Sequence, residues 1–172
     1  MPRLTLPEGG NQMRRLFGVT VLACLLSPGI ARAQSDSLSV QRQIQPLLDD
    51  MMVAANAHDT DRFLASYLHQ PSLVFVYDGV VTNGFANVRA LQLQAWNNGK
   101  SDVVYKNAGA LEFTILGPDA AVVTEPLESH RTLPTGVTST TAFAVTEIWQ
   151  KRPEGWRVVQ VHESTVRNAM HR

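Results

Sequence analysis

The chain has 172 residues, of which 44% are hydrophobic and 17% are charged, and its formal net charge is zero. This length and composition are typical of one ordinary globular domain with a core of its own. The sequence has neither a basic stripe that would suit nucleic acid nor an acidic tail that would suit a basic protein, so we expect no nucleic-acid partner.

The beginning of the chain is typical of a secretory signal peptide. The stretch MRRLFGVTVLACLLSPGIARAQS starts at Met13 with two arginines, continues as a short apolar run and ends in Ala31-Arg32-Ala33, which fits the small-x-small cleavage rule. The run is too short to span a bilayer, which argues against a membrane anchor. We therefore predict a signal peptide over residues 1–33, with Met13 as a candidate true start. The mature protein is then periplasmic or secreted, without a membrane attachment.

The single cysteine, Cys24, lies inside this predicted signal peptide and follows a poor lipid-attachment sequence. Cleavage would leave a mature chain without disulfides, without a thiol nucleophile and without a zinc–thiolate site. The sequence also has no phosphate-binding loop, no dinucleotide-binding fingerprint and no defensible metal-ligand spacing. We therefore expect no metal and no cofactor.

Two helices are expected at the start of the mature chain, after a flexible stretch over 34–39. Apolar residues recur at steps of three and four between Val40 and Ala55, which predicts an amphipathic helix of about four turns. Asp59 or Thr60 can cap a short second helix. A cap is also a simpler explanation of the His58–Asp61 cluster than a metal site.

The rest of the chain predicts one further helix and a series of strands. The helix is expected over 85–96, after the turn signals Asp78-Gly79 and Asn83-Gly84. Strands are expected over 72–77, 80–82, 103–116, 120–132, 137–150 and 156–166. Helices followed by strands with short turns indicate an α+β fold with an antiparallel sheet, in one domain over 40–172.

Three segments carry a resemblance to a known superfamily: AANAHDTDRFLASY, LVFVYDGVVTNGFANVRALQLQAW and EIWQKRPEGWRVVQVHES. With the strands between them they resemble the SnoaL-like branch of the nuclear transport factor 2-like superfamily. The small bacterial members and the association domain of calcium/calmodulin-dependent protein kinase are the most similar types. The resemblance implies a cystatin-like cone, in which a strongly curved antiparallel sheet wraps around a long N-terminal helix.

Two glutamates near the ends of the last segment, Glu147 and Glu163, are the candidate catalytic residues. In the kinase association domain, arginines and a tryptophan hold a small carboxylate in the cone. By resemblance, Trp96 stands at the tryptophan and the two glutamates stand at arginine positions. The reversed charge implies a cationic or neutral polar ligand, or a general base, in place of an anion site.

The register of the last hairpin decides whether both glutamates can face the cone. Side chains alternate along a strand, so a loop over 151–155 puts Glu147 and Glu163 on one face and His162 on the other. A register shifted by one residue puts His162 on the face of Glu147. The alternative for either glutamate is a place at the solvent rim, or an ion pair with Arg131, Arg157 or Arg167.

Four further residues are candidates for ligand binding. Tyr67 and Tyr77 can offer hydroxyls to a substrate oxygen, although each is equally compatible with a partly buried aromatic ring whose hydroxyl lies at the surface. Trp96 is a suitable platform for a ligand and is equally compatible with core packing. His162 is a candidate in one register only and is otherwise a structural histidine.

Three functions remain open at this stage. The first is a binding module for a small apolar or cationic molecule. The second is a cofactor-free isomerase, cyclase or dehydratase with a glutamate as base and a tyrosine polarising the substrate. The third is an oligomerisation domain whose cone is filled by side chains. All three stay open because fold is a weak guide to function. A homodimer through the open sheet face is expected from the resemblance alone.

Overall fold

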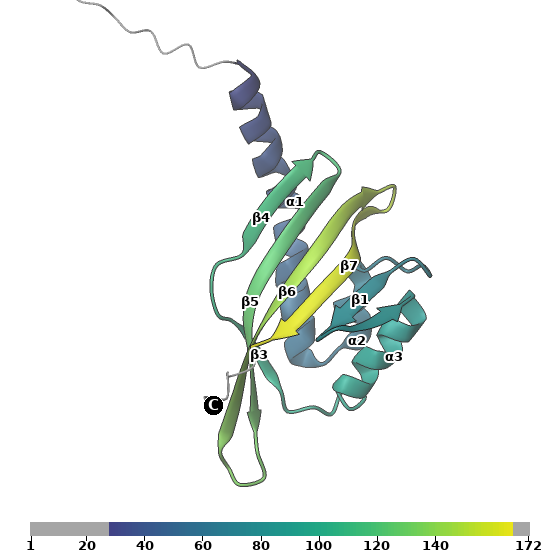
Figure 1. The fold of residues 1–172 in the computed structure, drawn as a ribbon, viewed down its shortest axis with the longest axis vertical. Coiled ribbons are helices and arrows are strands. Elements are labelled where there is room, and N and C mark those ends of the chain that lie inside the picture. Colours follow the sequence, from purple (N-terminus) through teal and green to yellow (C-terminus); the bar gives the residue numbers. More distant parts are fainter. Residues whose placement is uncertain (1–27, 167–172) are drawn as a thin grey trace, which may run out of the picture.

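The computed structural model describes residues 28–166, and the α+β prediction is confirmed. The elements are α1 (Pro28–Ala57), α2 (Thr60–Phe63), η1 (Leu64–Ser66), β1 (Val74–Tyr77), β2 (Val80–Asn83), α3 (Phe85–Ala95), β3 (Val104–Asn107), β4 (Glu112–Gly117), β5 (Ala120–Thr132), β6 (Thr138–Arg152) and β7 (Gly155–Thr165). Figure 1 shows strands β4 to β7 lying across α1, with α3 and the short strand β1 to one side.

The first helix begins earlier than predicted, at Pro28, so residues 34–39 are part of it. No glycine or proline interrupts residues 31–39, and nothing in that stretch therefore stops the helix. Residues 1–27 of the predicted signal peptide lie outside the described residues, and cleavage after Ala33 stays a prediction. Across the described range, no helix is both long and apolar enough to cross a membrane.

One face of α1 carries the predicted apolar stripe and packs on the inner face of the sheet. The buried residues of this stripe are Val40, Ile44, Leu48, Met51 and Ala55. The first four form one core with inward side chains of the sheet, including Val123, Val145 and Val158, whereas Ala55 packs with Trp96 and Val103. Burial of this apolar stripe is the main stabilising contribution of the helix, since isolated helices are marginal in water.

The short helix α2 starts at the cap that the sequence predicted. The Asp59 side chain accepts a hydrogen bond from the backbone N–H of Arg62, with an N···O distance of 3.1 Å. This bond satisfies one of the free donors at the first turn.

The strands form one sheet in the order β2-β1-β7-β6-β5-β3, and β4 also pairs with β5. The pairing of β1 with β7 is parallel, so the sheet is mixed and not purely antiparallel as expected. Most of the chain lies between these two strands, and a parallel pair is allowed because the connection is not a hairpin.

The predicted strand over 103–116 is divided into β3 and β4, which both pair with β5. Gly109 lies in the connection against Pro126. A Cβ atom at this glycine would stand 2.9 Å from the Pro126 Cγ, so a larger residue would require one of the two segments to move.

The hairpin of β6 and β7 contains an extra residue that sets the orientation of the later part of β7. Near the turn, Trp149 pairs with Val158, whereas the next pair along is Ile148 with Gln160. Val159 is therefore a β-bulge, which reverses the alternation of side chains beyond it. Because of this bulge, Glu163 lies on the same face of the sheet as Glu147.

The turn between β1 and β2 holds the end of β7. Asp78 and Gly79 have φ angles of 44° and 88°, the conformation that Asp-Gly adopts in tight hairpins. The Asp78 carboxylate accepts hydrogen bonds from the backbone N–H and the hydroxyl of Thr165, at 2.9 and 2.7 Å. These bonds fix the strand that carries Glu163.

Candidate functional site

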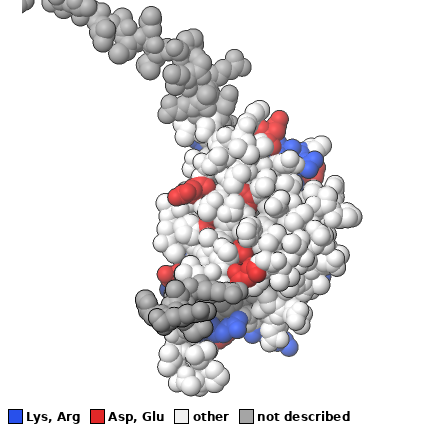
Figure 2. Space-filling view, in the orientation of Figure 1, with Lys and Arg blue, Asp and Glu red and all other residues white. Residues whose placement is uncertain are grey.

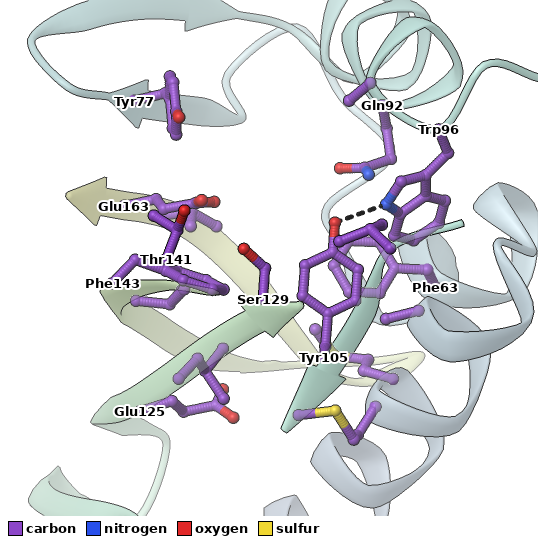
Figure 3. A pocket seen from close by; sticks show the side chains of 18 of the residues that line it. Phe63, Tyr77, Gln92, Trp96, Tyr105, Glu125, Ser129, Thr141, Phe143 and Glu163 are labelled. Atoms are coloured by element: carbon purple, nitrogen blue, oxygen red, sulfur yellow. Dashed lines mark hydrogen bonds between the residues drawn. The ribbon is translucent and has the colours of Figure 1, made fainter. Parts of the chain in front are cut away.

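A cavity of about 630 Å³ lies between the inner face of the sheet, α1 and the end of α3. Its wall is largely apolar, and its aromatic members are Phe63, Tyr67, Phe75, Tyr77, Trp96, Tyr105 and Phe143. Figure 3 shows this cavity with side chains pointing into it from the sheet on one side and from the helices on the other. The cone is therefore not filled by its own side chains.

Three glutamates point into this cavity from neighbouring strands: Glu125 on β5, Glu147 on β6 and Glu163 on β7. Across the sheet, Glu125 and Glu163 stand on either side of Val145. Glu147 is two residues further along β6, so it is diagonal to both, at a typical spacing of about 7–8 Å between backbones. Together these residues make an acidic patch on an otherwise apolar wall.

Glu147 is the most deeply buried of the three, with 1% of its surface exposed. The Trp149 indole N–H donates a hydrogen bond to its Oε2 over 2.8 Å. Burial raises the pKa of Glu147 well above its ordinary value, and the negative charge of Glu125 raises it further, while the bond from Trp149 lowers it. Burial therefore favours the protonated carboxylic acid form of Glu147, which can donate a hydrogen bond.

Glu125 and Glu163 titrate close to neutral pH. Burial raises the pKa of Glu125 to about 7, with a further contribution from the charge of Asp49. Burial likewise raises the pKa of Glu163 to about 7, with a contribution from the charge of Asp78. Carboxyl groups of this kind can gain and lose protons under physiological conditions, as general acids and bases do.

Glu125 is a site residue that the sequence reasoning missed. The sequence contains the signal, because the apolar residues Ala121, Val123 and Leu127 occupy every second position along β5 and Glu125 is in phase with them. In the structure all four residues are buried. A glutamate in phase with such a series has to point inward, since side chains alternate along a strand.

The two predicted tyrosines both line the cavity. Tyr67 is buried, with 2% of its surface exposed, whereas Tyr77 is 41% exposed and stands beside Glu163 in the parallel register. Burial raises the pKa of Tyr67 well above its ordinary value, and the charges of Glu147, Glu163 and Glu125 raise it further. Tyr67 therefore stays protonated and lies within electrostatic reach of all three carboxyl groups.

Trp96 forms part of the cavity wall and is also a core residue. It is 1% exposed, and its indole N–H donates a hydrogen bond to the Tyr105 hydroxyl over 2.9 Å, as Figure 3 shows. Its ring packs edge-on against Phe63 at 5.1 Å between centroids. The two interpretations of this tryptophan are compatible, because one face packs in the core and another meets the cavity.

The prediction that His162 binds a ligand in the cavity is wrong, because His162 points away from the cavity. His162 pairs with Thr146 on the outer face of the sheet and is exposed. The bulge at Val159 is the reason, because it turns Val161 and Glu163 inward and His162 outward. Near the turn, the hairpin starts in the register that would have placed His162 inward.

The other end of the cavity is polar but not acidic. Ser129 and Thr141 form one cross-strand pair there, and Arg131 and Ser139 form the next. Arg131 pairs with Asp102 at 3.3 Å. Among the described residues, no lysine or arginine forms an ion pair with the three cavity glutamates.

Most of the face seen in Figure 2 is uncharged. Acidic atoms lie at its top, its left edge and its middle, and basic atoms lie at the upper right and near the bottom. Over residues 28–166, no group of His, Cys, Asp and Glu has the arrangement of a metal site.

The sequence family described as the calcium/calmodulin dependent protein kinase II association domain matches residues 41–167. This match covers the second half of α1 and every strand of the sheet. No curated protein matches the sequence.

Solved structures with the same fold include three bacterial proteins. A nuclear transport factor 2-like protein of unknown function from Shewanella oneidensis is 24% identical, with a TM-score of 0.61, and the match covers 72% of this chain and 98% of that one. A nuclear transport factor 2-like protein with a cystatin-like fold from Novosphingobium aromaticivorans is 16% identical, with a TM-score of 0.67, covering 85% and 94%. A ketosteroid isomerase-like protein from Erwinia carotovora is 20% identical, with a TM-score of 0.59, covering 74% and 96%. These likenesses confirm the cystatin-like fold.

The raised pKa values predict that the protein is less stable in mild alkali than in mild acid. The folded state keeps the Glu125 and Glu163 protons up to about pH 7, whereas the unfolded chain loses them near pH 4.3. The free energy of unfolding therefore falls as the pH rises between these values. Glu125→Gln should remove on the order of 2 kcal/mol of this fall, measured by urea unfolding at pH 5 and pH 8.

Glu112→Gln is the matched control, because Glu112 is exposed on β4. It should leave the difference between pH 5 and pH 8 as it is in the wild type. If the free energy of unfolding falls equally from pH 5 to pH 8 in the wild type and in Glu125→Gln, the Glu125 carboxyl is hydrated in solution.

Proposed function

The chain belongs to the calcium/calmodulin dependent protein kinase II association-domain family of the nuclear transport factor 2-like superfamily, and from the cavity in its cone we propose that it binds a small, largely apolar molecule. The observation that carries this proposal is the open cavity of about 630 Å³, with its aromatic wall and buried carboxyl groups. Typical small-molecule sites have volumes of about 300–1,000 Å³ and combine an apolar wall with a few polar groups.

The open cavity favours ligand binding over a purely structural role. A domain that serves only to assemble gains nothing from carboxyl groups inside its core, since each one costs free energy when it ionises. Filling the same space with apolar side chains would stabilise the fold. The presence of three inward glutamates is therefore better explained by a ligand.

A second candidate function is proton transfer without a cofactor, and the arrangement of Glu163, Tyr67 and Glu147 favours it. An ionised Glu163 would remove a proton from the carbon next to a carbonyl group, and the electron pair would move to the carbonyl oxygen. The Tyr67 hydroxyl or the protonated Glu147 would donate a hydrogen bond to that oxygen. Return of the proton to another carbon gives isomerisation, and loss of a neighbouring hydroxide, protonated as it leaves, gives dehydration.

Export and assembly are also proposals. The signal-like segment before Gln34 supports a periplasmic or secreted protein, and the resemblance supports a homodimer. Intact mass spectrometry of the exported protein should give a chain that starts at Gln34. Recovery of the uncleaved chain from the cytoplasm alone would contradict the export proposal.

Binding in the cavity can be tested with the neutral, polarity-sensitive dye N-phenyl-1-naphthylamine. Its fluorescence should rise on addition of the wild-type protein. Ser129→Trp should weaken binding at least about tenfold, because the indole would occupy the cavity at the polar end. His130→Trp is the matched control, since the next residue points to the other face of β5. Equal binding by the two variants would place the dye elsewhere.

Proton transfer can be tested by deuterium uptake from heavy water into 4-phenylbutan-2-one, followed by NMR. The enzyme-dependent rate should rise with pH through about 7 as Glu163 ionises. Glu163→Gln should lower it by about 10²–10⁴-fold, the usual contribution of a general base. Glu128→Gln, on the outer face of β5, should leave it unchanged. If the wild-type rate equals that of buffer, the chemistry is absent for ketones of this kind.

A further inference from the structure

The deepest acidic group of the cavity without a partner is Glu125. Only 8% of its surface is exposed, and Figure 3 shows its side chain pointing into the cavity from β5. Within residues 28–166, its carboxyl group forms neither a hydrogen bond nor an ion pair. By contrast, Glu147 accepts a bond from Trp149. A carboxyl group that lines a cavity without a partner is available to a ligand, which gains free energy when it supplies a donor at this place.

The charges around Glu125 have one sign. The titratable groups that face it are Asp49 from α1, Glu147 from β6 and the neutral Tyr67 after η1. The basic residue that lines the cavity, Arg131, stands three inward positions further along β5, or about 20 Å away along the backbone, and pairs with Asp102. The missing partner of Glu125 is therefore a positive charge that the protein itself does not supply.

The wall next to Glu125 suits an apolar ligand body with an ammonium group. Leu48 and Met52 lie close to Glu125, and the rings of Tyr105 on β3 and Phe143 on β6 line the same cavity from the sheet. Aromatic faces attract ammonium groups when water is excluded, and carboxylates bind them by charge-assisted hydrogen bonds.

We propose that the ligand is an amine with an apolar body, and that the Glu125 carboxylate binds its ammonium group. The proposal rests on the cavity being a ligand site, and it names the class of ligand. It gives Glu125 a role separate from that of Glu163, the candidate base on the far side of Val145.

Amine binding would be coupled to proton release. Glu125 has a pKa of about 7, so near neutral pH it is only partly ionised and must lose a proton to pair with an ammonium group. The affinity for an amine that stays protonated therefore rises between pH 6 and pH 8. A route for the proton exists even when a ligand fills the cavity. Glu125 also lines a separate depression of about 160 Å³, together with the exposed Asp49.

Three probes with one apolar body separate the charge from the rest of the ligand. They are 4-phenylbutylamine, 4-phenylbutan-1-ol and 4-phenylbutyrate, titrated calorimetrically into the full chain at pH 6, 7 and 8. At pH 8 we expect the amine to bind at least tenfold more tightly than the alcohol, and the carboxylate to bind most weakly. The preference for the amine should shrink at pH 6.

Glu125→Gln tests the assigned residue. This variant should lose the preference for the amine and keep the affinity for the alcohol within threefold, which also shows that it is folded. Glu128→Gln, three residues along β5 on the outer face, should keep the preference.

The outcomes distinguish this inference from the proposed function. Equal binding of the amine and the alcohol to the wild type overturns the amine inference and leaves the ligand site intact. Retention of the amine preference in Glu125→Gln overturns the role of Glu125. If none of the three probes binds and the dye does not bind either, the ligand site itself is refuted.

Discussion

The alternation of side chains along β7, interrupted once at Val159, is the constraint on which the site depends. Before the bulge, Trp156 and Val158 point inward and complete the core under α1. After it, Val161 and Glu163 point inward and complete the wall of the cavity. A regular strand could satisfy only one of these two requirements, because side chains on one face recur at every second position. The bulge allows the same strand to serve a packed region and an open one.

The acidic patch shows a conflict between stability and the properties of the site. Three carboxyl groups share an apolar wall, and among the described residues no basic side chain neutralises them. Burial raises the pKa of all three, which favours their protonated forms and avoids the larger cost of buried charge. Violations of the usual rules for a core are expected at functional sites, where the surrounding structure compensates for them. Here the compensation comes from the apolar core between α1 and the sheet and from the hydrogen bonds that hold the end of β7.

Much of the fold could be predicted from the sequence, because apolar periodicity and turn residues are local signals. The helical stripe from Val40 to Ala55, the Asp59 cap and the Asp-Gly turn are all of this kind. The site was harder to predict from the sequence. The resemblance identified Glu147, whereas Glu125 required only the alternation along β5 and was overlooked. The orientation of His162 depended on a bulge, which no residue type in the hairpin marks, and the parallel pairing of β1 with β7 depended on contacts between distant segments.

The hydrogen bond between Trp149 and Glu147 has a consequence for observing the molecule. The Trp149 indole is fully buried, and its N–H donates to the Glu147 carboxyl group. This carboxyl group becomes charged only when it loses its proton. Ionisation would strengthen this bond and place a negative charge next to the ring. We therefore expect the fluorescence of Trp149 on β6 to change when Glu147 ionises. Events inside the cavity should be visible in the intrinsic spectrum, without a label and without disturbing the wall.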